Sequence, residues 1–333
     1  MKITSTTSRR GALKLGLAAS LAAPAIMTSG ARAQAWPPGT ITWINPFPAG
    51  GGTDTFARPL AAQVGEQLGC QIIIDNKGGA GGTVGASQAA KAKPDGSVFF
   101  VGAIHHTIAP SIYKSLDYDL EKNFEPITMI ALVPQVISIN PNKVPVKTAA
   151  EFIAYVKANP GKVNYASPGA GTAHHLAGEL FKLETKTEIT HVPYRGAGPA
   201  MQDLLAGNVD MMFDGMGTSA QQIKAGKLLG LAVATPKRTT EFPNIPTSAE
   251  IGVPNWIVST WYGLWAIKGT PKPIVDRMYT EVVKALGNPK LQKIWLDQTA
   301  QAGGEQPADF AKRIRAEIEK WQKVVAAAGV KLD

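Results

Sequence analysis

Short runs of β-branched residues alternate with longer segments whose apolar positions recur at helical spacing. Within residues 53–68, Phe56, Leu60, Val64 and Leu68 stand four apart and predict a helix with one buried face. Strands that alternate with helices predict parallel sheets with crossover helices, the α/β class. The predicted strands are 41–44, 71–75, 97–103, 162–166, 189–192, 209–213 and 228–234, and the predicted helices are 53–68, 82–91, 148–158, 172–183, 199–206, 273–286, 289–298 and 307–328.

Two longer extended stretches divide these elements into groups. Residues 127–140 are rich in β-formers and follow the first group, and the tryptophan-rich residues 256–267 follow the second. If each stretch crosses between two sheets, one lobe is discontinuous in sequence. We therefore predict a first lobe of residues 36–134 and 257–333 and a second lobe of residues 135–256. A ligand cleft between them would close by hinge motion.

The N-terminus has the layout of an export signal. Paired Arg9 and Arg10 precede an apolar run, residues 15–26, and a small-residue sequence that ends at Ala33. Paired arginines at this place are typical of the twin-arginine export route. The apolar run has about a dozen residues, whereas a bilayer span needs about 20. We predict that residues 1–33 are an export signal cleaved near Ala33, which makes the protein periplasmic; an uncleaved anchor is the alternative.

Most of the positive charge belongs to that segment. The formal net charge is +9, but residues 1–34 hold five basic residues and no acidic one, which leaves 29 Lys and Arg against 25 Asp and Glu, a net +4. Such a surplus permits an anionic ligand. Without a basic run interleaved with aromatic residues, we expect no nucleic-acid partner. Cys70 is the only cysteine, which excludes an intramolecular disulfide.

Three glycine-rich segments, residues 46–54, 76–85 and 167–172, each follow a predicted strand and open a predicted helix. Ligands of open α/β sheets bind at the carboxyl ends of strands, where helix N-termini offer unpaired amides and a positive dipole end. Facing loops on two lobes therefore predict a clamp for a carboxylate; the alternative is that they are plain connections. The candidate ligand-binding residues in these loops are Phe47, Gly51, Thr53, Asp54, Gly79, Ser167, Gly171 and Thr172.

Five further residues at predicted strand ends or helix starts are candidates for the cleft: His105, His106, His175, Arg195 and Asp214. Arg195 can bind a carboxylate through two parallel hydrogen bonds. For each of the five, a purely structural role is the alternative to ligand binding. A histidine can bond a carbonyl, an arginine can lie at the surface, and an aspartate can cap the next helix.

The sequence lacks motifs for nucleotide binding and catalysis. No segment supplies Walker A, and Val84 stands at the third glycine position of a dinucleotide fingerprint begun at Gly79. His174 and His175 are adjacent, without the i, i+4 spacing that a helical zinc site favours, and no Gly-x-Ser-x-Gly elbow is present. We therefore expect no catalytic residue, metal or cofactor. An exported α/β hydrolase is the competing class.

Several longer motifs occur in a fixed order along the chain. They are Pro46-Phe47-Pro48-Ala49-Gly50-Gly51-Gly52-Thr53-Asp54, Gly79-Ala80-Gly81-Gly82, Pro94-Asp95-Gly96, Tyr165-Ala166-Ser167-Pro168-Gly169-Ala170-Gly171-Thr172 and Val192-Pro193-Tyr194-Arg195-Gly196. With Asp203-Leu204-Leu205-Ala206-Gly207 after them, the chain resembles the Bug-type substrate-binding proteins of tripartite tricarboxylate transporters. The resemblance extends from residue 36 to the C-terminus, and it implies the two-lobed, Venus-flytrap fold of periplasmic binding proteins.

The resemblance also implies a function. Such receptors are not enzymes; they capture a small mono- or dicarboxylate, aliphatic or aromatic, by lobe closure and deliver it to a cognate tripartite tricarboxylate-type membrane permease. In the family the first-lobe loop, here Phe47 through Thr53, holds one carboxylate, partly through ordered waters. The second-lobe loop near His175 takes other polar groups, and the acidic position, here Asp214, helps tune ligand choice. We expect a monomer.

Two departures from the family pattern leave the ligand's identity open: Asn76-Lys77-Gly78-Gly79 before the second glycine turn, and the bulky pair His105-His106. Fold does not set the ligand. A ligand receptor for a signalling system would carry the same features, so the sequence alone does not separate sensing from transport.

Overall fold

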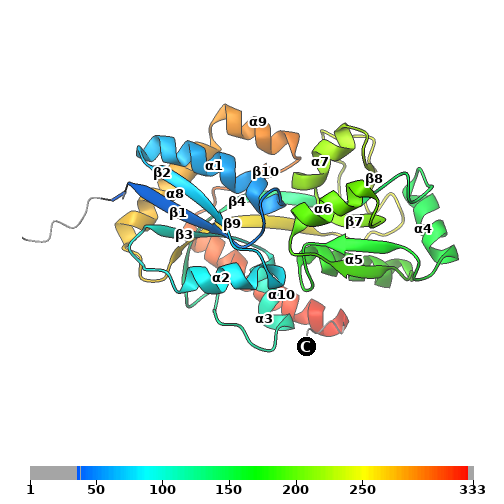
Figure 1. The fold of residues 1–333 in the computed structure, drawn as a ribbon, viewed down its shortest axis with the longest axis horizontal. Coiled ribbons are helices and arrows are strands. Elements are labelled where there is room, and N and C mark those ends of the chain that lie inside the picture. Colours follow the sequence, from blue (N-terminus) through cyan, green and yellow to red (C-terminus); the bar gives the residue numbers. More distant parts are fainter. Residues whose placement is uncertain (1–35, 38, 329–333) are drawn as a thin grey trace, which may run out of the picture. The chain divides into compact units, whose positions relative to one another are not determined.

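The computed structural model describes residues 36–37 and 39–328 (Figure 1), so the expected export signal lies outside the described residues. The first group of elements alternates strand and helix as the sequence predicts. It comprises β1 (Thr40–Asn45), α1 (Gly52–Leu68), β2 (Gln71–Asn76), the 3-10 turn η1 (Ala80–Gly82), α2 (Thr83–Ala90), β3 (Val98–Ala103) and α3 (His105–Ile112).

The second group begins with a long strand and repeats the alternation. It comprises β4 (Phe124–Ile139), α4 (Ala149–Ala158), β5 (Asn164–Ser167), α5 (Ala173–Thr185), β6 (Thr190–Pro193), α6 (Ala197–Ala206), β7 (Met211–Gly215), α7 (Met216–Lys224) and β8 (Leu229–Val233). The last group returns to the first lobe with β9 (Ser259–Ile267), α8 (Lys272–Leu286), α9 (Pro289–Asp297), β10 (Gln301–Ala302) and α10 (Pro307–Ala328).

Strand pairing gives an α/β fold of two lobes. In the first lobe β1 pairs in parallel with β2 and β3, and in the second β5 pairs in parallel with β6 and β7. The two sets are joined through β9 and β4 in the order β2-β1-β3-β9-β4-β7-β5-β6. The carboxyl ends of the parallel strands of both lobes therefore lead into the loops that face the space between them.

Two strands connect the lobes, β4 and β9, and they run side by side in antiparallel pairing (Figure 1). β4 pairs with β9 as far as Pro134 and then, from Gln135 onward, with β7. The change of partner supports the proposed boundaries, residues 36–134 and 257–333 against 135–256, which remain a proposal. A hinge at these two strands leaves each lobe's own sheet intact when the lobes move.

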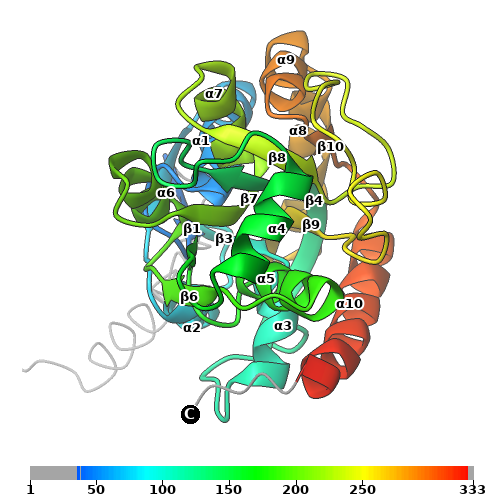
Figure 2. The ribbon, with the colours of Figure 1, turned by 90° about the vertical axis from the view of Figure 1, so that its right-hand side faces the viewer.

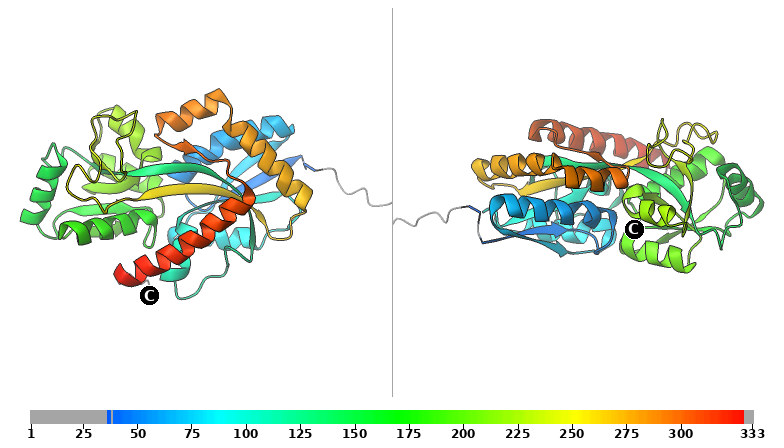
Figure 3. Two further views of the ribbon diagram at one scale, coloured as in Figure 1. Left: turned by 180° about the vertical axis from the view of Figure 1, so that it is seen from behind. Right: turned by 90° about the horizontal axis from the view of Figure 1, so that it is seen from above.

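Alternate residues of the strands build separate cores on the two faces of the second sheet. Tyr165 and Phe213 pack with α4 and α5, whereas the neighbouring Ala166 and Met212 pack with α6. This is the period-2 arrangement expected of a sheet covered on both faces. Figure 2, seen from the side of the second lobe, shows α4 and α5 in front. In Figure 3, α10 runs along the back of the molecule, where it packs against α3 and β4.

The helix that opens the first glycine loop is fixed by its apolar stripe. Phe56, Leu60 and Val64 of α1 are fully buried in the first core, as their spacing predicts. Burial of each such side chain contributes roughly 1.5–3 kcal/mol. Gly69 ends the helix in the left-handed conformation, with φ of 66°, and its amide satisfies the last carbonyls. The N-terminus of α1 is thus held in place by packing along its length.

Two helices are absent from the sequence prediction, α3 and α7. α3 contains Thr107, Ile108 and Pro110, all poor helix formers, and α7 opens with glycine, threonine and serine close together. Packing overrides propensity in α3, because its residues from His105 to Ala109 are all buried. Within the described residues, no helix is both long and apolar enough to cross a membrane.

Candidate functional site

A small cavity lies where the two lobes meet, with a volume of about 10 Å³. That is room for about one water molecule. The structure is therefore closed, and a carboxylate can enter only when the lobes move apart. The lining residues come from the first lobe, from the second lobe and from a connecting strand: Phe47, Gly51, Gly52, Thr53, His105, Pro168, His174, Ala197 and Tyr262.

The first wall is the N-terminus of α1. Its N-cap, Gly51, has no side chain to cap the helix, and among the described residues the amides of Gly52 and Thr53 find no acceptor. Helix N-termini carry a partial positive charge and attract anions. A Cβ at Gly52 would overlap the Tyr262 hydroxyl, so glycine is needed for this close approach. This wall therefore presents backbone hydrogen-bond donors and, at Gly51 and Gly52, no side chains.

Asp54 lies behind this wall and braces the loop. Its carboxylate accepts hydrogen bonds from the Gly50 amide at 3.2 Å and from Asn76 at 3.2 Å, and it pairs with Arg58 at 2.6 Å. A further contact comes from Asn45 at 3.4 Å. Asp54 is not among the cavity-lining residues. The geometry gives it a supporting role at the loop.

We expect Asp54→Ala to lower the free energy of unfolding by about 1–3 kcal/mol, because it leaves the Gly50 amide and the Asn45 side chain without their acceptor. The Asn76 side chain loses one of its two acceptors and keeps the Phe47 carbonyl. Urea denaturation measures this. Asp75→Ala is the matched control, since it removes only the half-exposed pair with Lys77 and should change stability by less than about 0.5 kcal/mol. Equal effects of the two substitutions would contradict the bracing role.

The opposite wall is the N-terminus of α6. Gly196 at its N-cap makes no side-chain capping bond, and the amides of Ala197 and Gly198 have no acceptor among the described residues. This helix end meets the end of α1 directly: a Cβ built on Gly51 would lie 3.7 Å from the Gly198 nitrogen and 3.8 Å from the Ala197 Cβ. Two uncapped positive helix ends, one from each lobe, therefore face one another.

The second-lobe loop, residues 167–172, is closed by its own hydrogen bonds. The Ser167 hydroxyl donates to the Gly169 carbonyl at 3.0 Å and lies 2.6 Å from His191 Nε2. The Thr172 hydroxyl donates to Gly169 at 2.7 Å and caps α5. Gly171 has a φ of 77°, which favours glycine, and its amide donates to His175 Nδ1 at 3.1 Å. Of this loop only Pro168 lines the cavity.

Three polar rings meet at the cavity from three elements: His105 at the start of α3, His174 in α5 and Tyr262 in β9. His105 Nδ1 accepts a hydrogen bond from the Ala173 amide at 3.0 Å, which joins the lobes and leaves the ring proton on Nε2. The His105 and His174 ring centres are 5.3 Å apart. Phe47 packs edge-on against His105 at 5.4 Å.

Asp214, at the end of β7, lies fully buried behind His174. Its Oδ2 accepts hydrogen bonds from the hydroxyls of Thr218 and Ser219, and its Oδ1 lies 3.7 Å from His174 Nε2. Burial raises the pKa of Asp214 to about 6 although the two hydroxyls act in the opposite sense, and burial lowers the pKa of His174 to about 3. With a neutral imidazole and a 3.7 Å separation, the two groups are not an ion pair in this state.

The structure thus brings four of the predicted residues to the cavity: Phe47, Gly51, Thr53 and His105. The others do not line it. His106 is buried in the first lobe with Nδ1 against the Ala103 backbone, and His175 stacks on His191 at 4.0 Å. Arg195 is exposed, and Gly79 precedes the η1 turn. Their assignment as ligand contacts remains a prediction.

Five cavity residues are absent from the predicted list: Gly52, Pro168, His174, Ala197 and Tyr262. Gly52 and Pro168 belong to glycine loops singled out by the sequence. Tyr262 lies in β9, which is buried from Thr260 onward, and the sequence analysis treated this stretch only as a crossing between the lobes. His174 and His175 point in different directions, as expected of adjacent helical residues, but the sequence does not say which of the two faces the cleft.

The buried histidines also predict how stability depends on pH. Burial lowers the pKa of His105, His106, His174, His175 and His191 below their usual value near 6.5. As pH falls below about 6.5, each of these histidines becomes protonated in the unfolded chain but stays neutral in the folded chain. The free energy of unfolding therefore falls by up to about 1.4 kcal/mol per pH unit for each histidine. Asp214 opposes this between about pH 4 and 6, because its raised pKa lets the folded chain bind the extra proton.

We therefore expect the free energy of unfolding to fall steeply between pH 6.5 and about 5, with five histidines outweighing one aspartate. Urea titrations at several pH values measure it. Asp214→Asn removes the opposing group and should steepen the fall below pH 6. A pH-independent stability over this range would contradict the neutral, buried state of the histidines.

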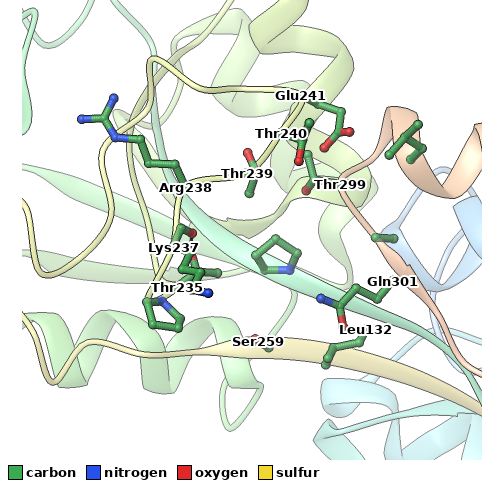
Figure 4. Close-up of a pocket in the computed structure, with 14 residues that line it drawn as sticks. Leu132, Thr235, Lys237, Arg238, Thr239, Thr240, Glu241, Ser259, Thr299 and Gln301 are labelled. Carbon is green, nitrogen blue, oxygen red and sulfur yellow. Dashed lines mark hydrogen bonds between the residues drawn. The ribbon is translucent and has the colours of Figure 1, made fainter.

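A second cavity, of about 410 Å³, lies on the hinge side (Figure 4). Its lining combines residues 235–241 of the second lobe with Leu132 and Gln301 of the first. Neither a glycine loop nor a helix N-terminus contributes to it. We place the ligand site in the smaller cavity, because there the amide donors of both lobes converge.

The smaller cavity can bind an anion without fixed positive charge. Its lining holds no lysine or arginine, only backbone donors, two neutral imidazoles, hydroxyls and apolar surface. Amides directed at one point hydrogen-bond the oxygens of a carboxylate well. Among the described residues no cluster of side chains suits a metal ion.

Comparison with known proteins identifies related chains. Residues 56–330 match the model of the tripartite tricarboxylate transporter family receptor. A solved structure of the periplasmic binding protein BugD is 36% identical, with a TM-score of 0.85 over 88% of this chain and 99% of that chain. The Rpa4515 protein of R. palustris, solved with adipate, is 36% identical with a TM-score of 0.86 over 89% and 100% of the two chains. MatC (Rpa3494) of Rhodopseudomonas palustris, with bound malate, is 33% identical with a TM-score of 0.81 over 86% and 98%.

Proposed function

Because the chain belongs to the tripartite tricarboxylate transporter family of receptors, we propose that it captures a small organic carboxylate by lobe closure and delivers it to a membrane transporter of the same system. Members of this family are periplasmic binding proteins and not enzymes. The Bug-type resemblance of the sequence is thereby confirmed. The partner permease and the ligand are our proposals.

The observation that carries the proposal is the meeting of two uncapped helix N-termini. α1 and α6 come from different lobes, and their ends lie so close that a Cβ built on Gly51 would lie 3.7 Å from the Gly198 nitrogen. Without an anion, closure brings two positive dipole ends together at a cost; with a carboxylate between them, the same closure becomes favourable. Ligand and closure are therefore coupled.

We propose a dicarboxylate as the preferred ligand class. The helix ends supply donors for one carboxylate, and the polar rings of His105, His174 and Tyr262 line the same cavity for a second polar group. Relatives solved with adipate and with malate support this choice, since both compounds are dicarboxylates. We propose that the protein is exported to the periplasm, which the signal predicted for residues 1–33 and the family's periplasmic members support.

Isothermal titration calorimetry with adipate, malate and a matched monocarboxylate, hexanoate, tests the proposal. We expect saturable one-to-one binding of at least one dicarboxylate and a higher melting temperature in its presence. Hydrogen exchange should slow in the first turns of both α1 and α6. Protection of one helix alone would contradict the two-lobe clamp, and the absence of carboxylate binding would overturn the function.

A further inference from the structure

The strands that join the lobes separate the hinge-side cavity from the ligand cavity. Leu132 and Pro134 of β4 line the hinge-side cavity. Val133, between them, lies on the other face: its Cγ1 and the Tyr262 hydroxyl are both 3.8 Å from a Cβ built on Gly215, and Tyr262 lines the ligand cavity. Successive side chains of a strand point to opposite faces. The two cavities therefore lie on opposite faces of the connecting strands.

Strand β9 shows the same alternation. Ser259 pairs with Pro134 and lines the hinge-side cavity, whereas Tyr262, three residues later, lines the ligand cavity. A rotation about these strands that separates the lobes on one face brings them together on the other. The hinge-side cavity is therefore widest while the ligand cavity is closed, and it narrows when the lobes open to admit a carboxylate.

Both lobes line the hinge-side cavity, and it has room for a small molecule. Its volume of about 410 Å³ lies within the range of about 300–1,000 Å³ that is usual for ligand pockets. The second lobe contributes residues 235–241, and the first lobe contributes residues 296 and 299–301. Figure 4 shows the Gln301 side chain reaching from the first lobe toward the second-lobe loop. A molecule bound here touches both lobes.

Two charged side chains of the lining lack an oppositely charged partner. Among the described residues, the Lys237 ammonium and the Glu241 carboxylate make neither an ion pair nor a hydrogen bond. The Arg238 guanidinium, by contrast, is paired with Glu250 through hydrogen bonds of 3.0 and 2.9 Å from Nε. Figure 4 shows Lys237 and Glu241 at different ends of the pocket. The lining thus presents one free positive and one free negative charge, set apart from each other.

Such a lining selects an occupant that carries both charges. A carboxylate complements Lys237 and an ammonium complements Glu241, whereas a singly charged molecule leaves one of the two side chains without a partner. An apolar chain between the two groups matches the apolar part of the wall. That part consists of Leu132, Pro134, Pro236, Leu296 and Ala300.

We propose that the hinge-side cavity is a second binding site, for a small zwitterion whose carboxylate and ammonium are separated by an apolar chain, and that its occupation favours the closed state. Opening narrows this cavity, so a molecule that fits the closed form binds the open form less well. A carboxylate in the ligand cavity also favours closure, so each ligand raises the affinity of the other by the same factor. The coupling rests on the proposed function, whereas the site rests only on its own lining.

Calorimetry with 6-aminohexanoate as the probe tests the site. The protein is first saturated with adipate, or with malate if only malate binds, so that the ligand cavity is occupied. We expect one-to-one binding that Lys237→Ala and Glu241→Ala each weaken at least about tenfold, because each removes a hydrogen bond to a charged group. Hexylamine and hexanoate, which carry one of the two charges each, should likewise bind at least about tenfold more weakly.

The matched controls are Lys227→Ala and Glu188→Ala, which alter exposed second-lobe residues outside the cavity and should leave binding of the probe unchanged. Thermal unfolding confirms that each variant folds. The same titration without the dicarboxylate measures the coupling. We expect the affinity for 6-aminohexanoate to be about fivefold lower, or less, in the absence of the dicarboxylate.

Failure of this site and failure of the proposed function give different results. No binding of 6-aminohexanoate, or binding that neither Lys237→Ala nor Glu241→Ala weakens, overturns the site and leaves carboxylate capture standing. An equal affinity without the dicarboxylate, or a higher one as competition gives, overturns the coupling. If neither adipate nor malate binds while 6-aminohexanoate binds through Lys237 and Glu241, the proposed function fails and the site stands.

Discussion

We expect a disulfide between positions 51 and 197 to weaken ligand binding at least a hundredfold while it is oxidised, and its reduction to restore binding. The Gly51→Cys/Ala197→Cys variant joins the two lobes across the cavity. A Cβ at Gly51 lies 3.8 Å from the Ala197 Cβ, close to the mean separation in disulfides. The locked cavity of about 10 Å³ admits no carboxylate, so the effect should be near total.

Cys70 is the only native cysteine, so Cys70→Ser is made in the same background to prevent mispairing. The oxidised and reduced forms of one variant are compared by calorimetry, which makes the reduced form its own control for the two substitutions. Mass spectrometry confirms the bridge. Equal binding in both forms would mean that ligand enters elsewhere or without lobe opening.

A single added methyl group at Gly198 should weaken binding at least tenfold without weakening the fold. In the closed state a Cβ at Gly198 would lie 2.8 Å from the Ala49 carbonyl oxygen on the other lobe. That contact exists only when the lobes are together, so Gly198→Ala opposes closure and spares each lobe. Inside a helix, alanine is favoured over glycine by up to about 1 kcal/mol. Stability should therefore hold or rise while affinity falls.

Melting temperature and calorimetric affinity are measured on the same Gly198→Ala protein. Gln202→Ala, an exposed substitution on the same helix, is the control and should leave both quantities unchanged. A Gly198→Ala variant that binds as tightly as the unmodified chain would show that Ala49 and Gly198 do not meet in the ligand-bound state.

The sequence predicts the fold well where local pattern and packing agree. The apolar stripe of α1 and the predicted span 307–328 of α10 match the structure because amphipathic spacing alone specifies those helices. α3 fails that test. Its Thr107, Ile108 and Pro110 have low helix propensity. The segment is helical because it is buried between the first-lobe sheet and α10. The contact between α3 and α10 joins residues about two hundred positions apart, so a local sequence pattern cannot predict it.

The site shows the same division. Glycine loops at strand ends are local signals, and they lead to Phe47, Gly51 and Thr53 at the cavity. The facing of α1 and α6, by contrast, depends on how two lobes dock. The motif that ends at Gly196 marks this loop, but nothing in it indicates that the helix end at Ala197 meets the end of α1. The choice between His174 and His175 depends on which face of α5 turns toward the cleft, and this is set by the packing of Leu176, Ala177 and Phe181.

The most direct test of a carboxylate clamped between two helix ends is a crystal structure of the complex with adipate. We predict one carboxylate within about 3 Å of amides from both lobes, Gly52 or Thr53 on α1 and Ala197 or Gly198 on α6. We also predict the second carboxylate among the polar rings of His105, His174 and Tyr262. A ligand bound to amides of a single lobe, or in the hinge-side cavity, would contradict the clamp.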